Sequence, residues 1–596
     1  MLKRILLAAI ALSFASSVTA QPGNGAEPVD FWLTVLHHND GESQLVNAGS
    51  GLEDFGGAAR FKALVDAARE AGLEGPRPRS QRGGKRGAVM LSSGDNFLAG
   101  PEFNVSVENG VPFYDTIALD LIGYDAIAIG NQDFDFGPDV LADFISGFTR
   151  PVPYLSANLD FSAEPRLQAY VDEGRIAGRV VIKERGELIG VVGATTPDLP
   201  FISSPRRVVV GEVAPAVQAE IDALEAAGVS KIVLVSHRQS FEGELGLAPL
   251  LSGVDIMIAG GGDELLANAG DVLIPGDEGS VYGAYPLLAT GADGAEIPVV
   301  TTPGEYKYLG RLVAGFDRHG RVVRVDDASG PIRVAGGTQP DAVDPDPVVQ
   351  ALVVDPVVAG LADLAANAIG TSEVALDGLR SSVRTMETNE GNLIADALLW
   401  QATELAASFG VPVPDVALQN GGGIRNNTVI AAGPITELDT FDMVPFPNFT
   451  TLVGGIDRGQ FKEILENAVS AVEFTSGRFA QVAGFSFTYD ALGVAQVLDA
   501  DGTVVTAGTR VTDVVLDDGT PIVLGGAIVP GPALNIATID FLAKGGDQYP
   551  YRGAPFTTLG VTYQQSLANY IVQGLGGLIS AADYPEGGEG RITRIN

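Results

Sequence analysis

The chain has 596 residues, more than one ordinary hydrophobic core accommodates, so we expect at least two domains. Its 37 lysines and arginines are outnumbered by 74 aspartates and glutamates, giving a formal net charge of −37 at pH 7. This balance argues against binding to nucleic-acid polymers or anionic membranes, because phosphate contacts require clustered basic side chains. An acidic surface is typical of adaptation to salt and also attracts divalent cations. The absence of cysteine excludes disulfides, thiol chemistry and a cysteine-linked lipid anchor.

The N-terminus has the pattern of a bacterial-type secretory signal. Met1-Leu2-Lys3-Arg4 is basic, an apolar run follows at residues 5–15, and Val18-Thr19-Ala20 is a small-residue cleavage pattern before Gln21. We therefore expect residues 1–20 to be removed and the mature protein to be periplasmic or secreted. No later stretch looks long and apolar enough to span a bilayer, so we predict no membrane span.

The first half alternates between strand and helix patterns. Continuous apolar runs end in polar or glycine turns and are separated by segments of helical period. The runs lie at residues 32–36, 88–91, 126–129, 188–192, 232–235 and 256–259, and the helical segments include 58–71 and 214–227. This alternation predicts an α/β sandwich whose strands are covered on both faces. Functional loops should then cluster at the carboxyl ends of the strands.

A change in composition separates the two halves. Residues 328–347 are rich in Gly, Pro and Asp, which indicates a linker, and residues 348–369 have the pattern of a connecting helix. Beyond residue 373 the patterns are mixed again, with helices expected at 391–409 and 461–472 and hairpins within 485–515. Asp499-Ala500-Asp501-Gly502 is similar to part of a calcium loop, but it lacks the downstream Glu, which favours a hairpin turn.

Five predicted strand ends carry side chains of the kinds that bind metals. They are His37-His38-Asn39-Asp40-Gly41-Glu42, Ser92-Ser93-Gly94-Asp95-Asn96, Gly130-Asn131-Gln132-Asp133-Phe134-Asp135, Ser236-His237-Arg238 and Ala259-Gly260-Gly261-Gly262-Asp263-Glu264. Any one of these segments alone is more often a plain turn. Carboxylates that converge from several strand ends would repel one another, so a bound divalent metal is the natural resolution.

In order and spacing, these segments resemble the metallophosphoesterases of the 5′-nucleotidase family, whose pattern is D-x-H, G-D, G-N-H-E/D, a lone His, and G-H-x-H or G-H-x-Q. The resemblance implies a four-layer α/β/β/α metallophosphoesterase sandwich over residues 30–330, a linker and connecting helix over 331–370, and an α/β substrate-binding domain over 371–596. It also implies that Asp40 binds a first metal, that Asp95 bridges two metals, and that Asn131 and His237 bind the second.

The metal-site segments depart from the family pattern at several positions. Glu42 replaces the second ligand, Gly262 replaces a histidine ligand, Glu264 replaces the final His or Gln, and Gln132 replaces the catalytic histidine that the aspartate matching Asp135 orients. Glu42 and Glu264 keep coordinating oxygens, and Asp263 can reach into the space left by Gly262. We therefore expect two divalent ions, with Mg²⁺, Mn²⁺ or Ca²⁺ favoured over Zn²⁺.

Gln132 alters the predicted chemistry. A glutamine can donate a hydrogen bond to a phosphoryl oxygen, but it has no proton that it can transfer at neutral pH. Loss of general-acid help costs roughly 10²–10⁴-fold in rate. Of the remaining histidines, we interpret His37 and His319 as structural and leave His38, beside the site, open.

The second half resembles the 5′-nucleotidase C-terminal domain more closely. The matching residues are Arg380 and Arg384 followed by residues 388–396, 420–425, 445–448 and 540–550. The resemblance implies that Phe446 and Phe541 stack on a purine, that Arg380, Arg384 and Arg425 lie near the phosphates, that Asp547 accepts from ribose hydroxyls and that Asn448 lies near the base. It also implies that this domain rotates to carry substrate to the metals, a motion with which a long linker and a connecting helix are compatible.

These observations predict an exported metal-dependent phosphoesterase that releases phosphate from nucleotides or related phosphate esters. The alternative is a nucleotide-binding protein of the same fold with weakened or lost catalysis, because of Gln132 and Gly262. A further alternative keeps the chemistry but acts on cyclic nucleotides, nucleotide sugars or simple phosphomonoesters. The sequence does not indicate an oligomeric state.

Overall fold

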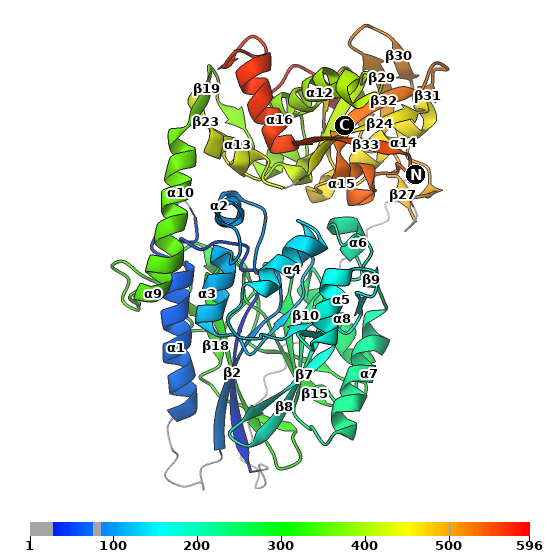
Figure 1. Ribbon diagram of the computed structural model, residues 1–596. Coiled ribbons are helices and arrows are strands. Elements are labelled where there is room, and N and C mark those ends of the chain that lie inside the picture. Colours follow the sequence, from blue (N-terminus) through cyan, green and yellow to red (C-terminus); the bar gives the residue numbers. More distant parts are fainter. Residues whose placement is uncertain (1–27, 50, 75–84, 447, 500–501) are drawn as a thin grey trace, which may run out of the picture.

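The chain folds into two halves joined along one side by a long helix (Figure 1). The computed structural model describes residues 28–49, 51–74, 85–446, 448–499 and 502–596. The predicted signal segment, residues 1–20, lies outside the described residues. In Figure 1 the N-terminal half is the lower body, blue to green, and the C-terminal half is the upper body, yellow to red.

Two sheets form the centre of the N-terminal half. The first has the order β17 (Val322–Val325), β16 (Tyr308–Phe316), β1 (Phe31–His38), β2 (Lys85–Ser92), β3 (Ala126–Ala128), β4 (Tyr154–Leu155) and β6 (Ile176–Ala177), with β18 (Gly330–Arg333) also paired to β16. The second has the order β14 (Leu287–Thr290), β15 (Glu296–Val300), β11 (Ile256–Gly260), β10 (Ile232–His237), β8 (Glu187–Thr195) and β7 (Arg179–Glu184). Strands β1, β2 and β3 run parallel, as do β8, β10 and β11.

Helices cover the outer faces of both sheets. Successive residues of a strand point to opposite faces, so Val35 packs between the two sheets while Leu36 packs under helices α1 (Ala58–Glu74) and α3 (Tyr114–Ile122). Helix α7 (Val213–Ala226) covers the second sheet. Both faces of the central strands are therefore buried, which explains their continuous apolar sequence. The predicted four-layer α/β/β/α arrangement is confirmed.

The segment between the halves differs from its prediction at both ends. Gly330–Arg333, which composition assigns to a linker, is strand β18 paired to β16. The helix begins at α9 (Pro347–Val349), where Asp346 caps the Val348 and Val349 N–H groups, and continues through a π-helical turn (Gln350–Val354) into α10 (Asp355–Ala366). It ends before residue 369 because Ala368–Ser372 forms strand β19, paired to β23 (Gly433–Thr436). The limits predicted for the domains stay a prediction.

The expectation that no stretch after the signal segment is long and apolar enough to span a bilayer is wrong for this helix. Among the described residues, Pro347–Ala366 is long and apolar enough to cross a bilayer by length and composition, with a mean hydropathy of 1.7. Helix α10 lies against α2 (Pro101–Asn109) of one half and α13 (Glu437–Met443) of the other. Gly360 permits the first contact, since a Cβ at that position would lie 2.5 Å from Val105 Cγ1.

Two five-stranded sheets dominate the C-terminal half. One has the order β25 (Ala480–Ala483), β21 (Val416–Asn420), β32 (Leu534–Ile539), β24 (Phe449–Ile456) and β33 (Phe556–Thr562). The other has the order β31 (Ala527–Ile528), β30 (Pro521–Leu524), β29 (Val511–Leu516), β26 (Phe485–Asp490) and β35 (Ile592–Ile595). The predicted helices are α12 (Asn389–Phe409) and α14 (Arg458–Ala468), the second ending earlier than expected. The predicted hairpins are confirmed by antiparallel pairing of β26 with β29 and of β27 (Val497–Leu498) with β28 (Val504–Thr506).

Candidate active site

The carboxyl ends of the central strands meet at one edge of the sandwich. His38 pairs with Ser92 in the first sheet, and His237 pairs with Gly260 in the second. The turns that follow are bonded to each other, since the Asp40 backbone N–H donates to the Gly94 carbonyl (3.0 Å). Asp40 and Asp95 both have a positive φ of 52°, an uncommon conformation for residues other than glycine. Such backbone conformations gather at functional sites.

Asp40, Asp95 and His237 form a buried triad. Each offers one ligand atom, and these atoms all lie within 4.8 Å of one another. His237 Nε2 is 2.8 Å from Asp95 Oδ2 and 3.9 Å from Asp40 Oδ1. His237 Nδ1 lies 2.8 Å from the Ser93 carbonyl oxygen, so an Nδ1–H donates there and Nε2 faces the carboxylates. Within the described part of the chain, no other group of three His, Asp or Glu side chains meets this spacing.

The electrostatics of the triad favour a cation. Burial, with Asp95 close by, raises the pKa of Asp40 to about 7, despite the opposing effect of His237. Burial alone would lower the pKa of His237, but Asp95 and Asp40 raise it to about 10. Two carboxylates held this close are relieved by positive charge, and two oxygen donors with one imidazole fit a divalent metal. The arrangement supports the predicted metal site.

The turn after β3 packs directly onto this triad. Asn131 Oδ1 lies 3.0 Å from His237 Nε2, and the Gln132 backbone N–H donates to Asp95 Oδ1 (2.9 Å). A Cβ at Gly130 would overlap Asp95 Oδ1, so the turn needs glycine at this position. The Gln132 side chain is half-buried, and its Oε1 is buried with no hydrogen-bond partner among the described residues.

Asp135 is held from a neighbouring segment. The Ser203 hydroxyl donates to Asp135 Oδ1 (2.7 Å), and Ser203 follows helix α6 (Leu199–Ile202). Burial raises the pKa of Asp135 to about 8, although the hydrogen bond from Ser203 opposes this.

The three carboxylates predicted to replace missing ligands lie around the triad and do not join it. Glu42 is half-buried, with its backbone N–H donating to the Asp95 carbonyl (3.1 Å), and burial, Asp40 and Glu305 raise its pKa well above the usual range. Glu264 Oε1 accepts from the Phe241 backbone N–H (3.0 Å). Glu264 Oε2 fills the space that a side chain at Gly262 would take. Asp263 is exposed, so the expectation that it reaches into this space is wrong.

Gln239 is a site residue that the sequence analysis missed. Its side-chain amide donates to Asn131 Oδ1 and lies 3.2 Å from His237 Nε2, and its backbone has a φ of 69°. The available signal was its position two residues after the lone histidine of the pattern.

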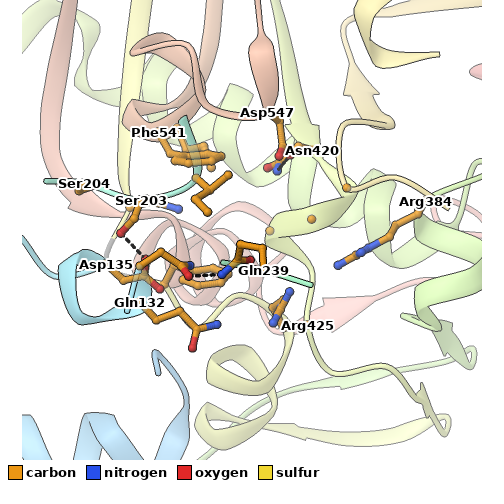
Figure 2. Close-up of a pocket in the computed structure, with 18 residues that line it drawn as sticks. Gln132, Asp135, Ser203, Ser204, Gln239, Arg384, Asn420, Arg425, Phe541 and Asp547 are labelled. Atoms are coloured by element: carbon orange, nitrogen blue, oxygen red, sulfur yellow. Dashed lines mark hydrogen bonds between the residues drawn. The ribbon is translucent and has the colours of Figure 1, made fainter. Parts of the chain in front are cut away.

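A cavity of about 260 Å³ joins the two halves at this site (Figure 2). Its N-terminal wall includes Asn131, Gln132, Asp135, Ser203, Ser204 and Gln239. Its C-terminal wall includes Arg384, Asn420, Arg425, Phe446, Asn448, Phe541 and Asp547. Figure 2 shows Phe541 and Asp547 in the upper part of the view and Gln132 and Asp135 below them.

The C-terminal wall combines basic and aromatic groups. The Arg425 guanidinium lies 5.5 Å from the centre of the Phe446 ring. Burial, with Arg380 and Arg425 nearby, lowers the pKa of Arg384 to about 10, and its Nε has no hydrogen-bond partner among the described residues. Asp547 accepts from Asn420 Nδ2 (2.6 Å), and burial raises its pKa. Arg380 is exposed and does not line the cavity.

The histidines outside the triad have structural contacts. His37 Nε2 lies 2.7 Å from the Tyr285 hydroxyl, and burial lowers the pKa of His37 to about 3. His38 stacks on Tyr306 with ring centres 4.6 Å apart, and burial lowers its pKa to about 3 as well. Both are therefore neutral at physiological pH. His319 lies away from the cavity, in the turn between β16 and β17.

Three comparisons identify the relatives of this chain. Residues 368–553 match the family model described as the 5′-nucleotidase C-terminal domain. The 5′-nucleotidase precursor of Thermus thermophilus is 30% identical and superposes with a TM-score of 0.71, covering 95% of this chain and 100% of that one.

Curated proteins agree with these matches. The trifunctional nucleotide phosphoesterase YfkN of Bacillus subtilis is 31% identical over 546 residues, which is 87% of this chain; the chain spans 32% of that protein's length. The 5′-nucleotidase of Bos taurus is 29% identical, over 77% of this chain and 75% of its own. With the two-sheet sandwich, the buried triad and the arginine- and phenylalanine-lined cavity, these matches establish that the chain belongs to the 5′-nucleotidase family.

Proposed function

We propose that the protein is a metal-dependent phosphoesterase that hydrolyses nucleotides, or closely related phosphate esters, and releases phosphate. The observation that carries the proposal is the shared cavity, in which the turn beside the triad faces the aromatic and basic wall of the other half. The names of the relatives, a 5′-nucleotidase and a nucleotide phosphoesterase, support the same reaction class.

The cavity walls suggest how a nucleotide binds. A base fits between Phe446 and Phe541, since aromatic faces stack on any base. Asp547 then accepts from ribose hydroxyls, and Asn448 lies at the base. Arg384 and Arg425 present forked donors suited to phosphate. This pose directs the phosphate toward Asn131 and the triad.

The residues present fit a divalent cation. Asp40, Asp95 and His237 would hold it, with Asn131 beside them and Glu42 close enough to Asp40 for the two charges to interact. A cation bound there would activate water and neutralise charge on the phosphoryl oxygens. The oxygen-rich donor set favours Mg²⁺, Mn²⁺ or Ca²⁺ over Zn²⁺. The chain itself fixes His237 through the Ser93 carbonyl and fixes Asp95 through the Gln132 backbone N–H.

We also propose that the protein is exported. The proposal rests on the basic, apolar and small-residue order of residues 1–20. Sequencing the N-terminus of the protein isolated from its source tests it: a mature chain that begins at Gln21 is expected.

One observation favours a second function, a nucleotide-binding protein with little turnover. Gln132 has no proton that it can transfer at neutral pH, and the carboxylate that fills the space beside Gly262 is tied to the Phe241 backbone. Both features weaken catalysis without affecting the aromatic wall.

Metal analysis and activity assays separate the two functions. Bound metals are measured by mass spectrometry, and AMP, ATP, UDP-glucose, a cyclic nucleotide and an aryl phosphate are assayed with added Mg²⁺, Mn²⁺ or Ca²⁺. We expect phosphate release from AMP that stops on chelation and returns with one of these ions. Tight binding of AMP without turnover under every metal would establish the binding protein instead. Asp95→Asn should abolish the activity, whereas Asp66→Asn, on the exposed face of α1, should not.

The aromatic wall has its own test. Phe541→Ala should weaken AMP binding by about 10-fold, because one stacking face is lost. Phe474→Ala removes a phenylalanine that is 83% exposed and lies outside the cavity, and should leave binding unchanged.

A further inference from the structure

We propose that Asp135 is the proton donor to the leaving oxygen and so supplies the step that a histidine at position 132 would otherwise perform. The inference rests on the proposed phosphoesterase function. It makes Asp135 a catalytic residue in its own right, where the family pattern gives this aspartate only an orienting role.

The position of Asp135 suits this role. Its side chain lines the cavity on the same turn as Asn131, which contacts His237 of the triad. The Ser203 hydroxyl donates to Asp135 Oδ1, which fixes the carboxyl and leaves Oδ2 for the cavity. Helix α6, immediately before Ser203, contacts the turn at Gly546–Gln548 in the other half. The carboxyl is thus held where both halves face the ligand.

The surroundings of Asp135 keep a proton on it near neutrality. Burial is the largest effect, and Asp95 adds like charge from the sheet side. Arg425 and the Ser203 hydroxyl act in the opposite direction, and Tyr563 faces Asp135 from the C-terminal half. The net result is a pKa of about 8, so the carboxyl is mostly protonated at pH 7 and ionises just above it. A general acid works best when its pKa lies near the working pH.

The other polar groups of the cavity suit the step less well. Gln132 is an amide, and its backbone N–H is already bonded to Asp95. Asp547 lies on the far side of the cavity and accepts from Asn420. Asp133 accepts from the Gly130 backbone N–H and does not line the cavity.

The step balances as follows. Water supplies the oxygen of the new bond to phosphorus and loses a proton to solvent. The bond between phosphorus and the leaving oxygen breaks, its electron pair stays on that oxygen, and the oxygen takes the proton of Asp135. The Asp135 carboxylate then regains a proton from solvent, so the net products are an alcohol and inorganic phosphate.

Two substrates that differ in leaving group test the assignment. An alkoxide leaving group, as in AMP, needs a proton, whereas 4-nitrophenolate leaves well without one. Asp135→Asn should therefore lower kcat for AMP by at least about 100-fold and kcat for 4-nitrophenyl phosphate by only a few-fold. In the unaltered protein, the AMP rate should fall as pH rises above about 8, and this alkaline limb should disappear in Asp135→Asn.

Two further variants separate chemistry from structure. Ser203→Ala removes a hydrogen bond that lowers the pKa of Asp135, so the alkaline limb should move to higher pH. Asp139→Asn changes an exposed carboxylate four residues along, outside the cavity, and should leave both substrates unaffected. Adding Gln132→His to Asp135→Asn should restore part of the AMP rate.

The outcomes distinguish two kinds of failure. If Asp135→Asn lowers both substrates equally while the bound metal is retained, Asp135 is a structural residue and the proton-donor role is wrong. An unaltered protein that hydrolyses neither substrate under any metal contradicts the proposed function and the inference together.

Discussion

At the scale of single residues, the triad depends on neighbours that the family pattern does not contain. Gln239 holds Asn131 through its amide and lies beside His237 Nε2, although it belongs to no motif. Groups that orient metal ligands typically account for 10–100-fold in affinity. Gln239→Ala should therefore weaken Mn²⁺ binding by about 10-fold, measured by titration calorimetry. Gln218→Ala removes a hydrogen-bonded glutamine from α7, distant from the cavity, and should leave the affinity unchanged. Equal affinities in both variants would show that Gln239 only packs there.

A second residue predicts how stability depends on pH. Glu390, in the first turn of α12, is buried, and burial raises its pKa to about 8 although Asn426 donates to it. An acid with a raised pKa binds its proton more tightly in the folded state, so its contribution to stability is lost as pH rises from about 4.5 to 8. Glu390→Gln should remove this loss, worth on the order of a few kcal/mol in the free energy of unfolding.

Denaturant titrations across this pH range measure the effect. The difference in free energy of unfolding between Glu390→Gln and the unaltered protein should change steadily in favour of the variant from pH 5 to pH 8. Glu404→Gln, exposed on the same helix, is the control and should leave the profile unchanged. A constant offset at all pH values would mean that Glu390 does not titrate in this range.

At the scale of elements, the connecting helix is sensitive to a single methyl group. Gly360 of α10 lies against Val105 of α2, and a branched side chain cannot move aside easily. Gly360→Ala improves helix propensity by up to about 1 kcal/mol, but overpacking typically costs 1–3 kcal/mol. We expect a net loss of stability and faster hydrogen exchange in α10. The matched variant Gly246→Ala, at an exposed position of helix α8 (Phe241–Leu247) with no atom near the new Cβ, should be neutral or stabilising.

Some strands could be predicted from the sequence and others could not. Strands β1, β2, β8, β10 and β11 were predictable because burial on both faces forces a continuous apolar run. Strand β18 was missed because Gly330 and Pro331 look like a linker, and only pairing with β16 makes them a strand. The positions of the triad were predictable because Asp40 and Asp95 follow strands and His237 ends one.

The side chains around the triad were less predictable than its backbone. Glu264 fills the space beside Gly262, and Asp263, the next residue along, is exposed. Which of two adjacent carboxylates points inward depends on the bond to the Phe241 backbone, a contact across the fold that no local pattern encodes. The same holds for Gln239, whose amide donates to Asn131, in a turn 108 residues away in sequence.

At the scale of the whole molecule, the net charge of −37 implies self-repulsion in the folded state. Salt at 0.15 M screens exposed charges beyond about 8 Å. The unfolding temperature should therefore rise as NaCl increases from about 10 mM to 500 mM, measured by circular dichroism with chelator present so that cation binding does not contribute. An unfolding temperature that falls with salt would mean that ion pairs outweigh the repulsion.

The cavity between the halves also bears on how fast a bound ligand is released. A ligand that contacts Asp135 and Asn131 on one wall and Arg425 and Phe541 on the other must lose one set of contacts before it departs. We predict that the two walls move apart in this step and that friction with the solvent limits its rate, because one half of the molecule then moves through the solvent. Turnover of a good substrate should then slow as glycerol or sucrose raises viscosity, while turnover of a poor substrate, limited by bond breaking, should not.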